Sequence, residues 1–299
     1  MANNEIRIDA LLPAEMATRA EYIGVRKAEA PAMQLFALAI LAGAFIGLGA
    51  IFATTIISGS SAVKAADGAM AFSIGVPFGV TKLLAGLVFC LGLILVVVGG
   101  AELFTGNNLI VMAWASGKVS LKGLLRNWGI VYLGNFVGSI GTAVLLLLSK
   151  QYTFGAGAVG LTALNIALGK VNLEFVQAIF LAILCNALVC LAVWMTFSAR
   201  STMDKIAAII FPITGFVAAG FEHSIANMYF ISVALFIKQF AGPGFWEAIG
   251  KTPADYASLT WGSFLFNNLL PVTIGNIIGG GVFVAAIYWL IFLRPAKDL

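Results

Sequence analysis

The chain has 299 residues, of which 61% are hydrophobic and only 10% are charged, and its mean hydropathy is +1.01. An ordinary soluble domain carries about 25% charged residues, so this composition excludes a soluble globular enzyme, a disordered chain and a coiled coil. An outer-membrane barrel is excluded as well, because its strands alternate apolar and polar residues, whereas the apolar stretches here are continuous. The sequence therefore predicts an all-α polytopic membrane protein.

Charge and cysteine content narrow the classes of site. The 17 Lys and Arg residues give a net charge of +4 but are scattered singly, so nothing indicates a nucleic-acid surface. Cys90, Cys185 and Cys190 lie inside apolar runs and are interpreted as small buried hydrophobic residues. The chain has one histidine, His223, which excludes a histidine-based metal site, and we expect neither a metal nor another cofactor.

The N-terminal region differs from the rest of the chain. Residues 1–32 carry both charge signs and predict an amphipathic cytoplasmic segment, in which Pro13 suits the first position of a helix. We expect this helix to lie at the membrane surface, where it is also a candidate docking surface for a cytoplasmic partner. Residues 33–295 then form the transmembrane channel domain, and residues 296–299 form a short cytoplasmic tail.

Six apolar stretches are long enough to cross about 30 Å of hydrocarbon. In chain order they are Met33–Ile57, Leu83–Trp114, Gly129–Leu148, Phe175–Phe197, Ile206–Ile237 and Leu269–Phe292. An even number of spans places both termini on one side, and that side carries 11 Lys and Arg residues against 6 on the other. The positive-inside rule therefore predicts cytoplasmic termini.

Two of these stretches are too long for one helix. Leu83–Trp114 and Ile206–Ile237 each contain about 32 residues, which is roughly 48 Å at 1.5 Å per residue. Each is interrupted by a polar run that contains glycine, at residues 99–108 and 220–227. Broken helices at matching places in two halves of a chain are typical of a binding or permeation site near the membrane midplane.

The two halves repeat each other. Glu102 and Asn107 recur 120 residues later as Glu222 and Asn227. A second pattern recurs at an offset of 141 residues, with Asn127, Gly134, Asn135 and Gly138 matching Asn268, Gly275, Asn276 and Gly279. Each half has three spans, so the second half enters from the opposite side, and we expect inverted repeats over about 33–149 and 172–295. The repeated Gly-x-x-x-Gly pairs, and small residues such as Ala39 and Gly43, predict closely packed helices.

Polar side chains inside the membrane are functional candidates because burying them is costly. Glu102 and Glu222 lie where the spans break, and we expect backbone N–H groups freed at the half-helix start to bind their carboxylates, with a direct substrate role left open. Asn107 and Asn227 are candidate caps of the returning half-helices. Motifs for enzymes are absent from the sequence, since it has neither a Gly-x-Ser-x-Gly elbow nor a Gly-rich phosphate loop.

His223 follows Glu222 in the second break. One interpretation is a neutral histidine whose hydrogen bonds hold the backbone of the helix break in one conformation. The other is a pore histidine that holds or donates a proton, because histidine changes charge near neutral pH and Glu222 can tune it. Asn135 and Asn276 are interpreted as ties between helices, although either could face a pore.

Three runs carry a family resemblance. Gly99–Asn108, Gly220–Asn227 and Pro271–Asn276 closely resemble the formate–nitrite transporter family, and Leu11–Met16 resembles its formate-channel branch. The resemblance extends over almost the whole chain, and the sequence departs from the formate-channel pattern mainly at Gly106–Asn108. It implies an aquaporin-like fold with spans 2 and 5 broken, in a homopentamer of the bacterial inner membrane with one pore per protomer.

The resemblance also implies roles for individual residues. His223 is the central pore histidine, Thr105 lies across from it, and Glu222 orients the site. The implied polar residues beside the histidine are Asn186 and Asn276, and Lys170 attracts anions in the outer vestibule. The implied apolar constrictions are Leu93 with Phe216 and the nearby Phe89 on one side, and Leu103 in a second ring.

The implied function is a passive or proton-coupled channel for small monovalent weak-acid anions. Formate is the expected substrate, and nitrite and hydrosulfide are the alternatives. An apolar constriction favours the neutral acid over the bare anion, and a protonated His223 could supply the proton. A competing mechanism keeps His223 charged so that it attracts a partly hydrated anion. The hypothesis of a neutral-solute pore is less well supported, because neither break contains the Asn-Pro-Ala triplet typical of aquaporins. A third hypothesis, a membrane receptor or scaffold, predicts that no solute crosses.

Overall fold

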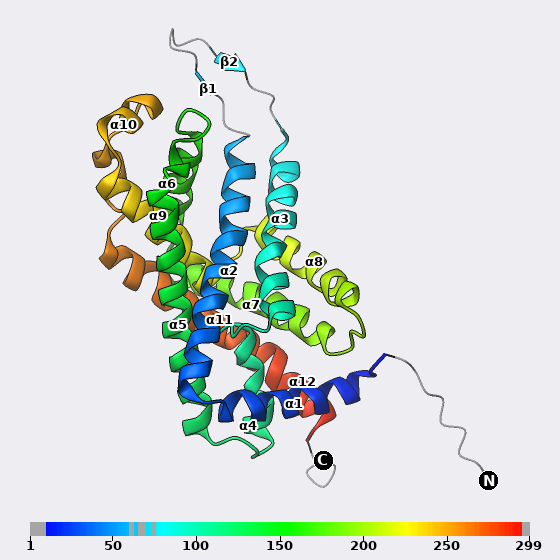
Figure 1. Ribbon diagram of the computed structural model, residues 1–299. Coiled ribbons are helices and arrows are strands. Elements are labelled where there is room, and N and C mark those ends of the chain that lie inside the picture. The colour runs from blue at the N-terminus through cyan, green and yellow to red at the C-terminus, as the bar shows by residue number, and fades with distance from the viewer. Residues whose placement is uncertain (1–9, 60–62, 65–69, 73–75, 295–299) are drawn as a thin grey trace, which may run out of the picture.

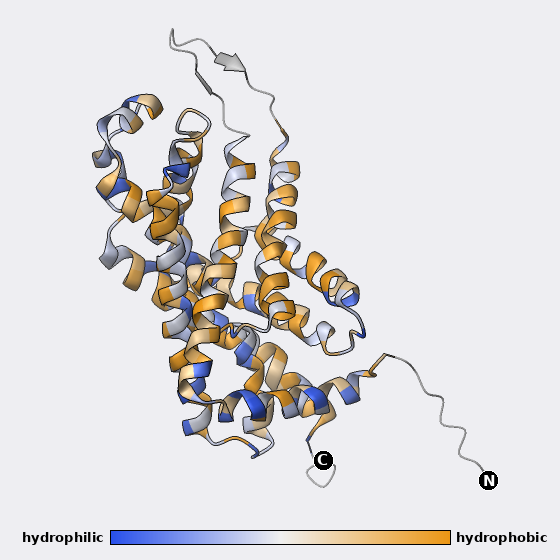
Figure 2. Ribbon diagram, in the orientation of Figure 1, coloured by the Kyte–Doolittle hydropathy of each residue, from blue (hydrophilic) through white to orange (hydrophobic). Residues whose placement is uncertain are grey.

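The computed structural model describes residues 10–59, 63–64, 70–72 and 76–294, so the predicted tail at 296–299 lies outside the described residues. Its architecture is helical apart from a short antiparallel pairing of β1 (Val63–Lys64) and β2 (Met70–Phe72). Figure 1 shows helices packed side by side, with α1 lying across one end of them and β1, β2, α6 and α10 at the other end. Apolar residues follow the long helices, and polar ones gather toward the two ends (Figure 2).

Six helical stretches in the described residues are long and apolar enough to cross a membrane. They are α2 (Ala32–Ser58), α3 (Phe78–Gly99), α5 (Leu121–Leu148), α7 (Phe175–Thr196), α8 (Thr202–Ala219) and the C-terminal stretch Ser263–Phe292. This C-terminal stretch joins η4 (Ser263–Leu269), α11 (Leu270–Ile277), η5 (Ile278–Ala286) and α12 (Ile287–Phe292), of which η4 and η5 are π-helical. The prediction of an all-α protein with six apolar spans is therefore confirmed.

The two predicted breaks are present. After α3 the chain turns at Gly100 and continues through residues 101–105 to η1 (Gly106–Ile110) and α4 (Val111–Ala115). After α8 it turns at Gly220 and continues to α9 (Ser224–Phe240). Gly100 and Gly220 have φ of +80° and +75°, the left-handed conformation that ends a helix and that glycine adopts without steric cost. The inversion of the second half stays a prediction.

Small residues bring the helices into backbone contact. A methyl group added at Gly138 of α5 would overlap the Ile40 carbonyl oxygen of α2, and one at Gly279 would overlap the Ile183 carbonyl oxygen of α7. In lipid, helix association depends on such close packing because the acyl chains are as apolar as the side chains. The predicted close approach of the glycine-bearing spans is confirmed in both halves.

Helix α1 (Pro13–Glu29) begins at Pro13, as predicted. Its apolar side packs on the first break, where Met16, Ala17 and Ala20 join a buried cluster that includes residues of η1 and α4. Glu21 of this helix is buried and pairs with Lys118. The N-terminal helix is therefore bound to the channel domain and covers one side of the first break.

Two segments predicted as outer loops contain helices. The segment between the third and fourth spans holds η2 (Gln151–Thr153) and α6 (Ala158–Val171), and the one before the last span holds α10 (Pro243–Ile249) and η3 (Pro253–Tyr256). Helix α6 is apolar but has only 14 residues, too few to cross the hydrocarbon core. Its contacts with α9 position Lys170 beside the second break.

Candidate functional site

Each break lines a cavity, and the two cavities share no lining residue. The α1 vestibule, about 320 Å³, is bounded by α1 and by residues of the first break, among them Gly100, Ala101, Glu102, Leu103 and Asn107. The α6 vestibule, about 290 Å³, is bounded by α6 and by residues of the second break, among them Gly220, Phe221, Glu222, His223 and Asn227. These sets match at an offset of 120 residues, so Leu103 occupies in one vestibule the place that His223 has in the other.

Apolar side chains separate the two vestibules. Phe89 and Phe216 line the α6 vestibule in an edge-to-face contact with ring centroids 5.7 Å apart, and the His223 ring lies against Phe216. Leu93 and Leu103 line the α1 vestibule, and all four apolar side chains are buried. The predicted constriction of Leu93 with Phe216 stays a prediction, and the structure places these two residues at the linings of different vestibules. Leu93 is one turn farther along α3 than Phe89 and so faces the other cavity.

His223 and Thr105 connect the two halves of the chain. The Thr105 hydroxyl oxygen lies 3.0 Å from His223 Nε2, and both residues are buried. Thr105 follows the first break and His223 begins α9 after the second. The structure therefore brings together the two residues that the resemblance placed opposite each other, although 118 residues separate them in sequence.

The hydrogen bonds of His223 define its neutral tautomer. Its Nδ1 accepts the backbone N–H of Ala226 at 3.0 Å and thereby caps the first turn of α9. A neutral imidazole has one N–H, so the proton lies on Nε2 and is donated to the Thr105 oxygen. The Thr105 hydroxyl proton has no other acceptor among the described residues. The Thr105 hydroxyl proton is therefore available to a further acceptor, while Thr105 itself is fully buried and lines neither vestibule.

Asn276 holds the second break against its neighbouring helices. Its Nδ2 donates to the carbonyl oxygens of Ala182 and Glu222 at 2.9 and 3.0 Å, and its Oδ1 accepts the Ser224 N–H at 2.9 Å. All hydrogen-bonding groups of the amide are thus used on backbone atoms. In the first half Asn135 does the same, binding the Ala39 and Glu102 carbonyl oxygens and the Phe104 N–H.

Asn186 supports Thr105 from behind. Its Nδ2 donates to the Thr105 carbonyl oxygen at 3.3 Å and to the Asn276 carbonyl oxygen at 2.6 Å. Cys190, one turn later on α7, contacts the same Thr105 carbonyl oxygen through its Sγ at 3.3 Å. All three predicted buried cysteines are buried and free. The polar residues around the histidine therefore mainly fix the backbone of the two breaks.

Glu222 is neutralised by an ion pair. Lys170 Nζ lies 2.7 Å from Glu222 Oε1, and the side chains are 16% and 5% exposed. Asn227 and Asn268 donate to Glu222 Oε2 at 2.6 and 3.2 Å, and Asn268 also donates to the Lys170 carbonyl oxygen. A buried carboxylate with a cation and two amide donors is stable where an unpaired one would not be.

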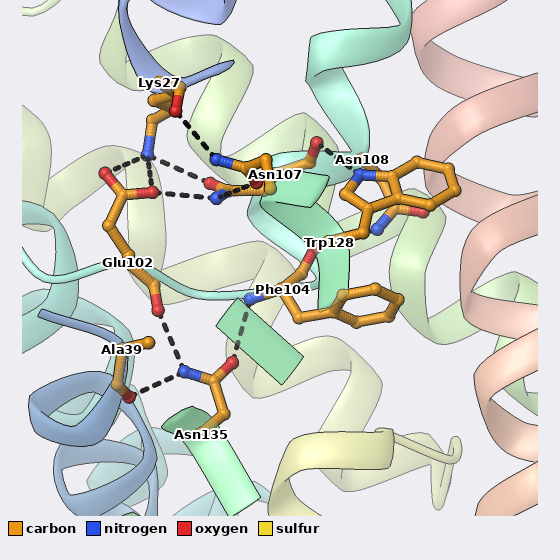
Figure 3. A network of polar contacts seen from close by, with 9 residues as sticks. Lys27, Ala39, Glu102, Phe104, Asn107, Asn108, Trp128 and Asn135 are labelled. Carbon is orange, nitrogen blue, oxygen red and sulfur yellow. Dashed lines mark hydrogen bonds and ion pairs between the residues drawn. The ribbon is translucent and has the colours of Figure 1, made fainter. Parts of the chain in front are cut away.

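The first half contains an equivalent cluster, drawn in Figure 3. Lys27 lies 2.8 Å from both carboxylate oxygens of Glu102, and Asn107 donates to Glu102 at 2.7 Å. Asn107 also donates to Asn127, which donates to the Lys27 carbonyl oxygen. The same pairings of lysine with glutamate, and of the two asparagines with each other and with the lysine backbone, recur among Lys170, Glu222, Asn227 and Asn268. One difference is that Asn107 Oδ1 accepts from Lys27, whereas Asn227 Oδ1 is buried without a partner.

These clusters correct two predictions. Within the described residues, Glu102 and Glu222 accept hydrogen bonds from Lys and Asn side chains and not from backbone N–H groups. Asn107 and Asn227 do not cap the half-helices, because their amides bind these carboxylates, and His223 is the cap of α9. Sequence reasoning also missed Lys27, which precedes Lys170 by 143 residues, the spacing that also separates Ala39 from Ala182.

The arrangement of two broken helices around a buried polar pair, between two vestibules, defines a membrane channel or transporter. The model of the formate/nitrite transporter family matches residues 14–290. The formate channel FocA of Escherichia coli K12 is 47% identical over 286 residues, which cover 96% of each chain.

Solved structures agree with this match. A pentameric formate channel with formate bound has a TM-score of 0.80 and 49% identity, with coverage of 88% of this chain and 98% of that one. An ion channel of the FNT family has a TM-score of 0.73 and 28% identity, with coverage of 93% and 98%. The chain belongs to the formate/nitrite transporter family, and the resemblance to its formate-channel branch is confirmed.

Proposed function

We propose that this protein is a channel for formate and other small monovalent weak-acid anions. The observation that carries the proposal is the His223–Thr105 pair, a buried hydrogen-bonded contact at 3.0 Å beside apolar side chains that separate two vestibules. The similarity to formate channels supports formate as the first substrate. Nitrite and hydrosulfide share its small size and single charge and remain alternatives.

The apolar separation favours passage of the neutral acid. Moving a bare anion into a dry, low-dielectric constriction costs up to tens of kcal/mol by Born reasoning. Protonating a carboxylate with a pKa of about 4 at pH 7 costs only about 4 kcal/mol, at 1.36 kcal/mol per pH unit. Neutralisation is therefore the less costly route past Phe89, Leu93, Leu103 and Phe216.

His223 and Thr105 can supply that proton through one path. The resting pair gives the anion a hydrogen bond from Thr105, but net proton donation from neutral His223 would leave an imidazolate. His223 must therefore first gain a proton on Nδ1, which displaces the Ala226 N–H from that atom. The Nε2 proton then moves to Thr105 as the Thr105 proton moves to formate, which leaves His223 neutral with its proton on Nδ1. The resting tautomer is restored when Nδ1 gives up this proton and Nε2 gains one.

The similarity to a solved channel supports a proposal for the assembly, and the charge distribution supports one for the location. We propose a homopentamer with one pore per protomer, because the chain aligns with a pentameric formate channel at a TM-score of 0.80. We also propose the bacterial inner membrane with cytoplasmic termini, which the distribution of Lys and Arg favours. Native mass spectrometry of the purified protein tests the pentamer. A cytoplasmic partner that docks on α1 stays a prediction.

Proteoliposomes that contain a pH-sensitive dye test the function directly. Formate, nitrite, hydrosulfide, chloride and glycerol are added in turn, with empty liposomes as the control for leakage through lipid. We expect a fast pH response to formate and none to chloride, with no osmotic recovery in glycerol. Osmotic recovery in glycerol without a formate response would instead establish a neutral-solute pore.

A missing formate response could mean either that the pore is closed at the pH of the assay or that the protein does not conduct formate, so further conditions are needed to distinguish the two. The measurement is therefore repeated at pH 5, 6 and 7 and with residues 1–32 deleted, since α1 borders one vestibule. No formate flux under any of these conditions would refute the proposed function.

A further inference from the structure

One hydrogen bond joins matching positions of the two halves of the chain. The Tyr132 hydroxyl oxygen of α5 lies 2.7 Å from the Thr273 hydroxyl oxygen of α11. The two residues are 141 apart, which is the offset that also relates Asn135 to Asn276. Neither hydroxyl belongs to the Thr105–His223 pair, so the contact has a role that the proton path itself does not explain.

A second hydrogen bond fixes the direction of the first. The Thr273 hydroxyl donates its single proton to the Leu269 carbonyl oxygen, at 2.7 Å. Its oxygen is then an acceptor toward Tyr132, and the Tyr132 hydroxyl is the donor. The two hydroxyl groups thus form a chain that ends on the backbone of the C-terminal stretch, and both of their protons are used.

Tyr132 also contacts the first break. Its ring packs edge-to-face on the ring of Phe104, with the ring centroids 4.9 Å apart. Phe104 immediately precedes Thr105, and its backbone N–H is held by Asn135 (Figure 3). Asn135 lies three residues after Tyr132 on the same helix. Helix α5 therefore holds the residue before Thr105 in two ways, through its ring and through its backbone.

Thr273 has the matching relation to the second break. Asn276 lies three residues after it on α11. The Asn276 amide binds backbone atoms of Glu222 and Ser224, the two residues that flank His223. Helices α5 and α11 pack mainly on different neighbours, α5 on α2 and α9, and α11 on α7. The bond between the two hydroxyls therefore links two helices that each hold one break through an asparagine.

We propose that Tyr132 and Thr273 are positioning residues, which set the distance between Thr105 and His223. The proposal rests on the proposed function, because this distance matters to permeation when a proton moves between the two residues. The Thr105 oxygen and His223 Nε2 are 3.0 Å apart, and a contact beyond about 3.5 Å is no longer a hydrogen bond. A relative shift of α5 and α11 by about half an ångström is thus enough to break it.

Removal of either hydroxyl tests this proposal. Tyr132→Phe keeps the ring on Phe104 but deletes the donor, and Thr273→Val deletes the acceptor with nearly the same shape. Asn186 still joins the two breaks through its contacts with two carbonyl oxygens, which limits the shift. We expect proton-linked formate flux at pH 7 in the dye assay to fall about three- to tenfold in each variant, the effect of one hydrogen bond of ordinary strength. The double variant should lose no more than the larger single loss.

A double-mutant cycle with Thr105→Val separates positioning from a general effect on the fold. Thr105→Val lacks the hydroxyl whose position is at issue, so its residual flux should be insensitive to the tie. Adding Tyr132→Phe to Thr105→Val should therefore change the flux by less than about twofold. A reduction as large as the one in the wild-type background would overturn the positioning role, because Tyr132 would then act on the channel as a whole.

Thr142→Val is the matched control for Thr273→Val. The Thr142 hydroxyl also donates to the carbonyl oxygen four residues earlier, that of Gly138 at 3.0 Å, and among the described residues it contacts no hydroxyl of another helix. Thr142→Val should keep the wild-type flux, and Thr273→Ser should stay within about twofold of it because the acceptor is retained. Thermal unfolding in detergent checks that each variant is folded.

Three results would overturn the positioning role. They are wild-type flux in folded Tyr132→Phe and Thr273→Val, a loss in Thr142→Val as large as that in Thr273→Val, and a loss in Thr273→Ser as large as that in Thr273→Val. Absence of formate flux in the wild-type protein would instead refute the proposed function.

Discussion

Replacing His223 with asparagine separates the two roles that the structure gives this residue. An asparagine Oδ1 can accept the Ala226 N–H, as His223 Nδ1 does at 3.0 Å, and asparagine is a favoured residue at the start of a helix. Its Nδ2 faces Thr105 but lies one bond short of the position of Nε2, so it does not reproduce the 3.0 Å contact without movement of Thr105. The variant therefore keeps the cap and weakens the contact with Thr105, and it has no site that binds a proton near neutral pH.

The expected loss of flux follows from acid–base equilibrium. With a pKa of about 4, roughly one formate in 10³ is protonated at pH 7, and this fraction rises tenfold for each pH unit below it. If His223 supplies the proton, His223→Asn must rely on formic acid already present in solution. We expect formate-linked proton flux at pH 7 to fall by about 10²- to 10³-fold, and the residual flux to rise about tenfold from pH 7 to pH 6.

The dye assay in proteoliposomes measures both quantities, and thermal unfolding in detergent checks that the variant is folded. His223→Ala is the structural comparison, since loss of the cap should cost about 0.5–2 kcal/mol of stability, which His223→Asn retains. Proton-linked formate flux in His223→Asn that matches wild type in rate and pH profile would refute proton donation by His223. The residue would then act only through its hydrogen bonds.

Three further predictions concern the surrounding structure. Thr105→Val removes the hydroxyl while keeping the shape, and it should lower formate flux at least about tenfold in the dye assay, whereas Thr105→Ser should stay within a few-fold of wild type. Lys27→Met leaves the partly buried Glu102 without its cation and should lower the free energy of unfolding by about 2–3 kcal/mol, most of which Lys27→Met/Glu102→Gln should recover. Gly138→Ala forces a methyl group into the Ile40 carbonyl and should cost about 1–3 kcal/mol, whereas Gly141→Ala, with no atom within 4 Å, should cost nothing. An equal effect of the two glycine variants on thermal unfolding would contradict the packing argument.

Hydrophobicity and repeat analysis predicted the spans well because both depend on local composition. The first predicted span, Met33–Ile57, differs by one residue at each end from α2 (Ala32–Ser58). The third begins eight residues earlier than predicted, at Leu121, because Lys122 and Arg126 reduce the local hydropathy without ending the helix. Helix α6 was missed since its apolar stretch is short and is preceded by glycine-rich turns.

The site was predicted less completely because its contacts join distant parts of the chain. Spacing within one break could identify His223 and Thr105 as candidates, but not their 3.0 Å contact. It also could not show that His223 is the helix cap, since that depends on the direction in which the chain leaves the turn at Gly220. The repeat did contain a usable signal for Lys27, at a constant spacing of 143 residues from Lys170.

The two halves also show where the pore departs from its own symmetry. The ion pairs, the amide ties and the vestibule linings all recur between the halves, so they serve the fold that both halves share. Leu103 and His223 occupy equivalent positions, yet one is apolar and the other can carry a proton. Under the proposed function, the α6 vestibule would be the side on which an anion meets a proton donor, and the α1 vestibule the side on which the neutral acid emerges beside Leu103. In a passive pore the reverse passage uses the same steps, so an anion that arrives through the α1 vestibule must also reach Thr105 before it is neutralised.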